Sequence, residues 1–92
     1  MKINDIRRVI RNEVQKKGYG LEERQSVSTN SWYFKIYSGD TSLMFRVADH
    51  RTKTDVITLR VDKNFSTQSV IGFVRNRCQD LSNRRLRMLL GM

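Results

Sequence analysis

The sequence predicts a single α+β domain in which a helix, three antiparallel strands and a second helix follow one another. Three observations support this prediction. Apolar residues recur at helical spacing near both ends of the chain, and they alternate with polar residues in the middle. The 92 residues can also build one hydrophobic core but not two. A sheet with one solvated face needs cover on its other face, which two helices can supply.

The first helix is expected over residues 5 to 17. Asn4 or Asp5 can serve as its N-cap, and Gly18 can end it. Its apolar residues fall on one stripe at helical spacing: Ile6, Val9, Ile10 and Val14.

The middle of the chain reads as a sheet. Residues 21 to 27 are ambiguous and could form a first strand or an irregular one. Three further stretches alternate apolar and polar side chains and predict the three main strands, at residues 31 to 37, 43 to 48 and 56 to 61. Ser38-Gly39-Asp40 predicts a hairpin turn between the first two of these.

The second helix is expected to begin after Ser66 or Thr67, either of which can cap it. Ser82 can start a further short helix over residues 83 to 90. The apolar stripe of the second helix consists of Val70, Val74, Cys78 and Leu81.

The composition favours a polyanionic partner. Lys and Arg number 18 against nine Asp and Glu, which gives a formal net charge of +9. Such an excess on a short chain is typical of nucleic-acid binding, although a merely basic, solvated surface is the alternative. No apolar stretch is long enough to span a membrane. Because Cys78 is the only cysteine, no intramolecular disulfide can form, and a reducing, cytoplasmic location is expected.

The positive charge is concentrated near the two ends of the chain. Arginine is suited to this role because its planar guanidinium can bind a phosphate through two hydrogen bonds. Arg46 and His50 are expected to add contacts at the end of the sheet, and Arg51 can hold a phosphate. The predicted binding residues are therefore Arg7, Arg8, Arg11, Arg46, His50, Arg51, Arg84, Arg85 and Arg87.

The open face of the predicted sheet mixes aromatic and cationic side chains. Aromatic rings among cations suit stacking on bases, although tyrosine is also an ordinary strand residue. The residues predicted on this face are Tyr33, Lys35, Tyr37, Met44, Arg46 and Arg60.

Few residues suit catalysis, and none suggests a cofactor. One His and one Cys cannot build a structural zinc site, and no glycine-rich phosphate loop occurs. His50 could act as a general base on RNA, with Arg51 and Lys53 holding the phosphate. Alternatively, His50 is a turn residue beside Asp49. A third interpretation is a homodimer formed through Leu86, Leu89 and Leu90.

A short first helix ending at Lys17-Gly18-Tyr19, followed by a strand pair, resembles the HicA-type mRNA-cleaving toxins of the double-stranded-RNA-binding fold. The resemblance implies an endoribonuclease toxin. Those toxins carry their catalytic His in a stretch that enters a strand. The comparable stretch here, residues 28 to 32, contains no His.

The stretch Phe45-Arg46-Val47-Ala48-Asp49-His50 resembles small phage proteins with a strand ending in Arg-(Val/Ile/Leu)-x-(Asp/Asn)-His. The similar layout extends from about Ser31 to Leu81. This group includes anti-CRISPR proteins of streptococcal phages. The resemblance implies a phage or mobile-element protein that acts in a bacterial host and inhibits an RNA-loaded Cas nuclease.

Overall fold

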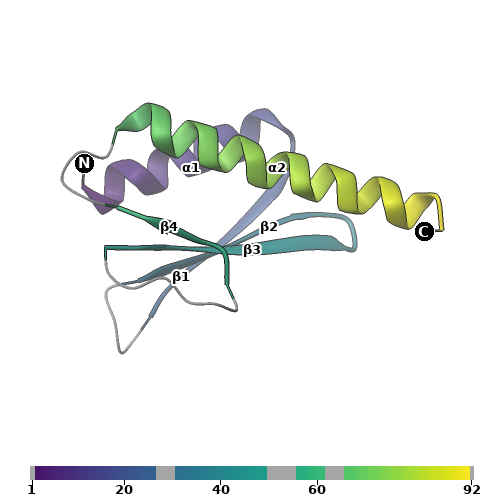
Figure 1. The fold of residues 1–92 in the computed structure, drawn as a ribbon, viewed down its shortest axis with the longest axis horizontal. Coiled ribbons are helices and arrows are strands. Elements are labelled where there is room, and N and C mark those ends of the chain that lie inside the picture. The colour runs from purple at the N-terminus through teal and green to yellow at the C-terminus, as the bar shows by residue number, and fades with distance from the viewer. Residues whose placement is uncertain (1, 27–30, 50–55, 62–65, 92) are drawn as a thin grey trace.

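The computed structural model describes residues 2–26, 31–49, 56–61 and 66–91. Two helices, α1 (Ile3–Lys16) and α2 (Thr67–Leu89), lie side by side on one face of a sheet (Figure 1). The α+β class and the order of helix, sheet and helix are confirmed. The strands are β1 (Gly20–Gln25), β2 (Trp32–Ser38), β3 (Thr41–Ala48) and β4 (Thr58–Arg60).

Among the described residues, the sheet has four strands in the order β1-β2-β3-β4, one more than the three main strands predicted. The additional strand, β1, falls on the stretch from residue 21 to 27 that was offered as a possible strand. β1 and β2 pair antiparallel, as do β2 and β3, whereas β3 and β4 pair in parallel. The amide of Arg46 donates to the carbonyl of Ile57 at 2.8 Å, and Val61 donates to Ala48 at 2.8 Å. The predicted antiparallel direction of residues 56 to 61 is therefore wrong. Their alternation could not indicate the direction, because it is the same for parallel and antiparallel strands.

Helix α1 begins earlier than predicted. Its N-cap is Lys2, so Asn4 and Asp5 lie within the first turn and do not cap it. Asp5 still suits this position because a carboxylate there faces the positive end of the helix dipole. The helix ends at Lys16, and Gly18 follows its C-cap, Lys17. Gly18 has φ +74° and donates to Gln15, while Tyr19 donates to Val14. This pair of bonds satisfies the last carbonyls in a left-handed turn that glycine adopts without strain.

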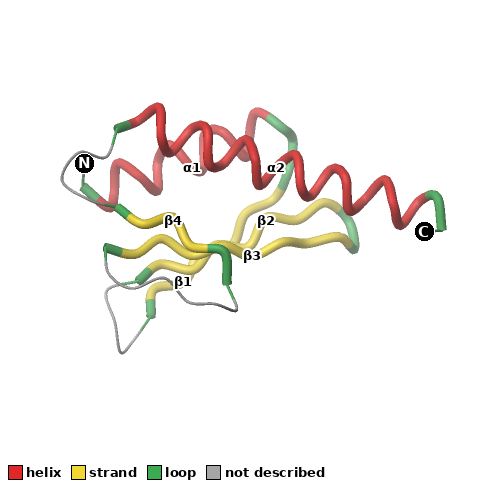
Figure 2. Tube along the Cα trace, in the orientation of Figure 1, coloured by secondary structure: helices red, strands yellow, loops and turns green. Residues whose placement is uncertain are grey.

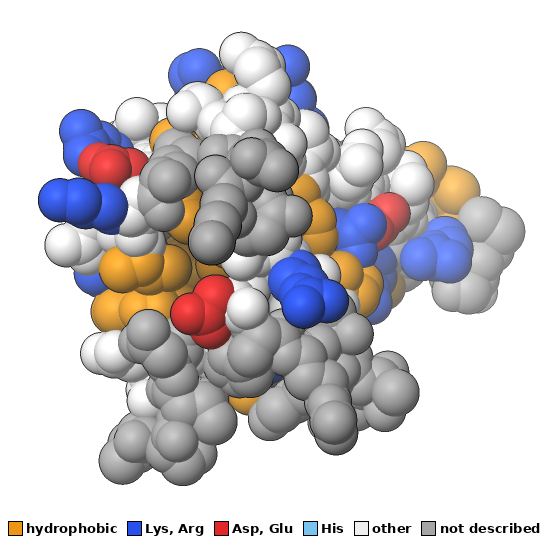
Figure 3. All heavy atoms as spheres, turned by 60° about the vertical axis from the view of Figure 1, so that its left-hand side comes forward, with side chains coloured by type: hydrophobic (Ala, Val, Ile, Leu, Met, Phe, Trp, Pro, Cys, Tyr) orange, Lys and Arg blue, Asp and Glu red, His pale blue; other side chains and the backbone are white. Residues whose placement is uncertain are grey.

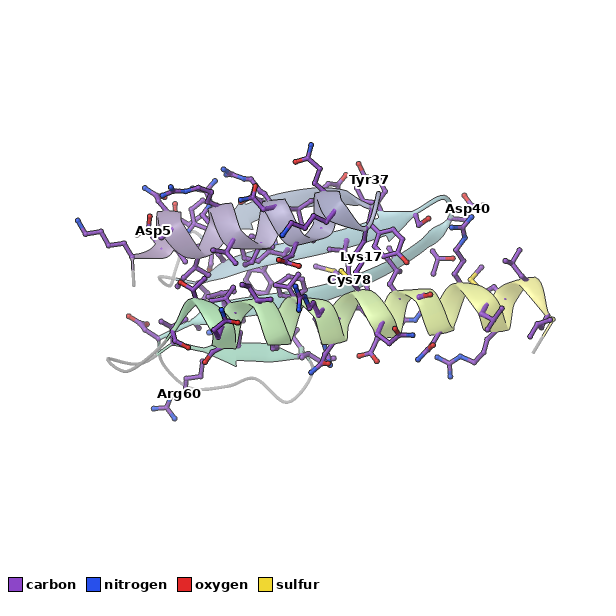
Figure 4. All side chains as sticks on the ribbon, turned by 90° about the horizontal axis from the view of Figure 1, so that it is seen from above. Asp5, Lys17, Tyr37, Asp40, Arg60 and Cys78 are labelled. Atoms are coloured by element: carbon purple, nitrogen blue, oxygen red, sulfur yellow. The ribbon has the colours of Figure 1, made fainter. Side chains whose placement is uncertain are left out.

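Helix α2 is one continuous helix of 23 residues, so Ser82 does not start a new one. Ser66 caps it as predicted, with its hydroxyl accepting from the amide of Ser69 at 3.2 Å. Figures 2 and 4 show α2 running beside α1 and then continuing past the end of α1. Every residue from 82 to 91 is exposed, which makes this half of α2 a projecting segment.

The core lies between the helices and the sheet. Phe34 of β2 and Phe45 of β3 stack with ring centroids 5.2 Å apart, and Phe73 of α2 meets Phe45 edge-on at 5.4 Å. The predicted apolar stripes of both helices are confirmed, although Val9 is only half-buried. Their buried members are Ile6, Ile10, Val14, Val70, Val74, Cys78 and Leu81.

Candidate nucleic-acid interface

Two arginines of α1 bind one carboxylate of the sheet. Arg7 donates from Nε to Glu23 Oε1 at 2.9 Å, and Arg11 donates from Nε to Glu23 Oε2 at 2.6 Å. Glu23 lies on β1, directly under the helix, and its side chain is only 16% exposed. These arginines were predicted to contact a polyanion, but their charge is used to join α1 to β1.

The arginines of α1 also contact other residues of the domain. The guanidinium of Arg7 lies 3.8 Å from the ring centroid of Trp32, and its Nη1 donates to Asn4. Arg8 pairs with Asp5 one turn earlier on the same helix. Each of these three arginines is therefore paired with a carboxylate, and Arg7 and Arg11 share the same one.

A second buried carboxylate joins the two helices. Glu13 of α1 is 4% exposed and accepts from Lys16 and from Arg75 of α2, both at 3.3 Å. Burial alone would raise the pKa of the Glu13 carboxyl, but the hydrogen bonds and charges of its two partners outweigh burial and lower it. The pKa of Glu23 is lowered in the same way, against the effect of burial, by Arg11 and Arg7.

These shifts predict a loss of stability in acid. Both carboxylates have a folded-state pKa below the ordinary value of 4.5. Near and below that pH, the unfolded chain therefore binds more protons than the folded chain, and acid favours unfolding. Their contribution is therefore complete above about pH 5 and is lost as the pH falls through the folded-state pKa. Urea unfolding of wild type and Glu23→Gln should show a difference at pH 7 that shrinks at pH 3.

Glu22→Gln is the matched control, because Glu22 lies next to Glu23 but has a side chain that is 65% exposed and 3.9 Å from Lys35. This variant should follow wild type at both pH values. If Glu23→Gln were as stable as wild type at pH 7, the carboxylate would not hold α1 to the sheet.

The arginines of the projecting half of α2 are arranged differently. Arg84 Nη1 donates to the carbonyl of Ser42 at 2.7 Å, and Arg85 Nη1 donates to Ser38 Oγ at 3.0 Å. Both bonds reach the β2–β3 hairpin, whose turn contains Asp40 (Figure 4). Arg87 is exposed. Within residues 2–26, 31–49, 56–61 and 66–91, none of these three arginines forms an ion pair with a carboxylate.

Arg46 does not lie on the exposed surface. It is 1% exposed and its Nη2 donates to Ser31 Oγ at 2.8 Å. The expectation that it presents its charge on an open sheet face is therefore wrong. The alternation assigned it correctly to the face opposite Phe45 but could not show that this part of the face is covered. His50 and Arg51 lie outside the described residues.

Other side chains of the open sheet face have partners of their own, although Met44 and Arg60 are exposed. Lys35 lies 3.9 Å from Glu22, and the Arg24 guanidinium lies 5.3 Å from the ring centroid of Tyr33. The ring of Tyr37 fills the space above Gly20, where a Cβ atom would be 2.2 Å from it. The two tyrosines are thus already engaged, which makes this face a weaker candidate than the projecting half of α2.

A groove of about 560 Å³ is lined in part by Arg84 and Arg87. It brings together residues from β3, from the segment before β4 and from α2, which are far apart in the sequence. Its lining consists of Leu43, Ile57, Asp80, Asn83, Arg84, Leu86 and Arg87. Figure 3 shows positive, negative and apolar side chains next to one another at this end of the molecule. The sequence analysis identified Arg84 and Arg87, but no pattern pointed to Ile57 or Leu43.

Comparison with known proteins identified no relative of this chain. No protein-family model, curated protein or solved structure matches this chain. The assignment of the site therefore rests on its own geometry and charge.

Other chemistry has little support within the part of the chain that the structure describes. Cys78 is 2% exposed, and burial raises the pKa of its thiol, with a smaller opposing effect from Lys17. That thiol stays protonated near neutral pH, which suits a core residue better than a nucleophile. The described residues contain no cluster of three or more His, Cys, Asp or Glu side chains that could hold a metal ion. None of the described helices is long and apolar enough to cross a membrane.

Proposed function

We propose that this protein binds nucleic acid, alone or within a nucleoprotein complex, through Arg84, Arg85 and Arg87, here called the α2 arginines. The observation that carries the proposal is the contrast between the two ends of the chain. Arg7, Arg8 and Arg11 are paired with carboxylates. The α2 arginines have no such pair among the described residues, so their charge remains available to an anionic partner.

The geometry favours phosphate as the group that is bound. A guanidinium has five N–H donors, and the one bond that Arg84 and Arg85 each make to the hairpin leaves most of them free. Those bonds also hold the two side chains in place, which lowers the entropy cost of binding. Phosphate contacts of this kind supply affinity and register without reading sequence.

A nucleoprotein partner is supported by the strand pattern at Arg46 to His50, which resembles that of phage anti-CRISPR proteins. In this form of the proposal, the α2 arginines bind the RNA or DNA held by a Cas nuclease. An RNA-loaded nuclease therefore belongs among the test partners, beside duplex DNA and double-stranded RNA.

Charge reversal of all three α2 arginines to Glu is expected to weaken binding by tenfold or more at low salt. The slope of log affinity against log salt should become shallower by roughly 0.9 for each phosphate of duplex DNA that the variant no longer neutralises. Fluorescence anisotropy of labelled duplexes, measured across a salt series, checks both effects. Asp40→Asn should act in the opposite direction, because it removes the carboxylate of the neighbouring hairpin turn.

The matched control reverses three exposed cations elsewhere, Lys2, Arg24 and Arg60, and lowers the net charge by the same amount. Figure 4 shows that Arg60 points away from the molecule at the end opposite the projecting half of α2. This control should lose much less affinity. Equal losses of affinity in the two triple variants would show that the net charge, and not the α2 arginines, drives binding. Light scattering on wild type also tests the homodimer interpretation.

A further inference from the structure

We propose that the groove beside α2 holds one unpaired nucleotide, so that the protein prefers single-stranded nucleic acid over a duplex. This inference rests on the proposed function and names its ligand more closely. The groove is the place where two of the α2 arginines, Arg84 and Arg87, meet an apolar surface built by Leu43, Ile57 and Leu86.

The cationic rim of the groove suits a phosphate. Arg84 is held by its bond to the carbonyl of Ser42, and Arg87 lies one turn further along α2 on the same side. The carboxylate that lines the groove, Asp80, pairs with Arg77 at 3.0 Å, so its charge is compensated. The net field at the rim is therefore positive.

The floor of the groove suits the face of a base. Leu43 is 6% exposed, while Ile57 and Leu86 are 44% and 56% exposed. A base can be covered on its face by apolar side chains when it leaves the stack. Inside a duplex, both faces of each base are covered by neighbouring bases, so the interior of a duplex cannot use this floor.

The Asn83 side chain is placed to read the edge of that base. Its oxygen accepts from Gln79 Nε2 at 3.0 Å, which orients the Asn83 amide and leaves its N–H donors available. These donors can meet an acceptor on a base edge. The volume of about 560 Å³ lies within the usual range for small-molecule sites, about 300–1,000 Å³.

The charge argues for a nucleotide over other occupants. A second copy of this chain would bring its own +9 charge against the same arginines. An apolar peptide would leave the rim guanidiniums without an anion. A nucleotide combines an anionic phosphate with an apolar face, which matches both parts of the groove.

The test compares a labelled single-stranded oligonucleotide with a duplex of the same sequence by fluorescence anisotropy at one salt concentration. Wild type should bind the single strand more tightly. The double variant Ile57→Gln, Leu86→Gln keeps the charge and should weaken single-strand binding by about tenfold, because it removes most of the apolar floor that covers the base, while duplex binding stays unchanged. Leu89→Gln is the control, because Leu89 is 75% exposed on the same helix but does not line the groove.

The outcomes separate this inference from the proposed function. Equal binding of single strand and duplex, with both abolished by reversing the α2 arginines, would overturn the nucleotide site and leave the proposed function standing. A double variant that binds the single strand like wild type would also overturn it. A wild-type protein that binds neither nucleic acid, nor the RNA-loaded nuclease, would overturn the proposed function itself. Circular dichroism of each variant confirms that the fold is intact.

Discussion

Phe45→Ala is expected to destabilise the fold by about 4 kcal/mol, within the range measured for large aromatic truncations in cores. Phe45 is fully buried on β3, where it stacks on Phe34 of β2 and meets Phe73 of α2 edge-on. Its removal takes away the packing that joins the sheet to α2, and it leaves a cavity that three different elements would have to close.

Because small domains have a free energy of unfolding of only about 5–15 kcal/mol, the alanine variant is expected to be close to unfolding. Phe45→Leu, which keeps most of the volume, should be less destabilised and allow a full urea titration. Met44→Ala is the neighbouring control, because Met44 is 50% exposed on the other face of β3. Equal destabilisation at positions 44 and 45 would contradict the burial pattern of this strand.

Arg46→Ala is expected to have the second large effect, a destabilisation of about 3 kcal/mol from the cavity that a large buried side chain leaves. The Arg46 side chain is among the largest that are fully buried, and its Nη2 donates to Ser31 Oγ at 2.8 Å. Truncation removes that hydrogen bond and the packing of a long aliphatic stem, and it leaves a cavity behind. Ser31→Ala should show the cost of the hydrogen bond alone, on the order of 1 kcal/mol.

Arg60→Ala is the control for this experiment. Arg60 lies on the neighbouring strand β4 and is paired in register with Ala48, but its side chain is exposed. Its truncation should change the free energy of unfolding by less than about 0.5 kcal/mol. If Arg46→Ala also fell within that range, Arg46 would not be a structural residue, and a role in binding a partner would become its better explanation.

The fold was largely predictable because its pattern is local. Apolar residues recur at helical spacing in α1, at positions 6, 10 and 14, which indicates a helix. They alternate with more polar neighbours in β2, at positions 34 and 36, which indicates a strand. The direction of β4 was not predictable, because the Thr58 to Arg60 stretch alternates in the same way whichever direction it runs. The continuity of α2 through Ser82 also escaped prediction, because serine is common both as a cap and within an exposed helix.

The site was predictable only in part. The sequence identified both arginine clusters but could not show which one is paired with carboxylates, because Glu23 reaches Arg7 and Arg11 only when β1 lies under α1. Glu13, which joins the helices, could not be recognised for a similar reason. The groove depends on Ile57 and Leu86 meeting in space, and a contact between residues this far apart cannot be inferred from spacing along one chain.

The two outer strands of the sheet bear on how the protein behaves in concentrated solution. β1 forms one edge and carries three consecutive charged residues, Glu22, Glu23 and Arg24. β4 forms the other edge and is only three residues long. Charged side chains and short edge strands both hinder a second sheet from pairing edge to edge. Growth of the sheet from molecule to molecule is thereby opposed at both sides, which leaves the projecting half of α2 as the surface best suited to contact another macromolecule.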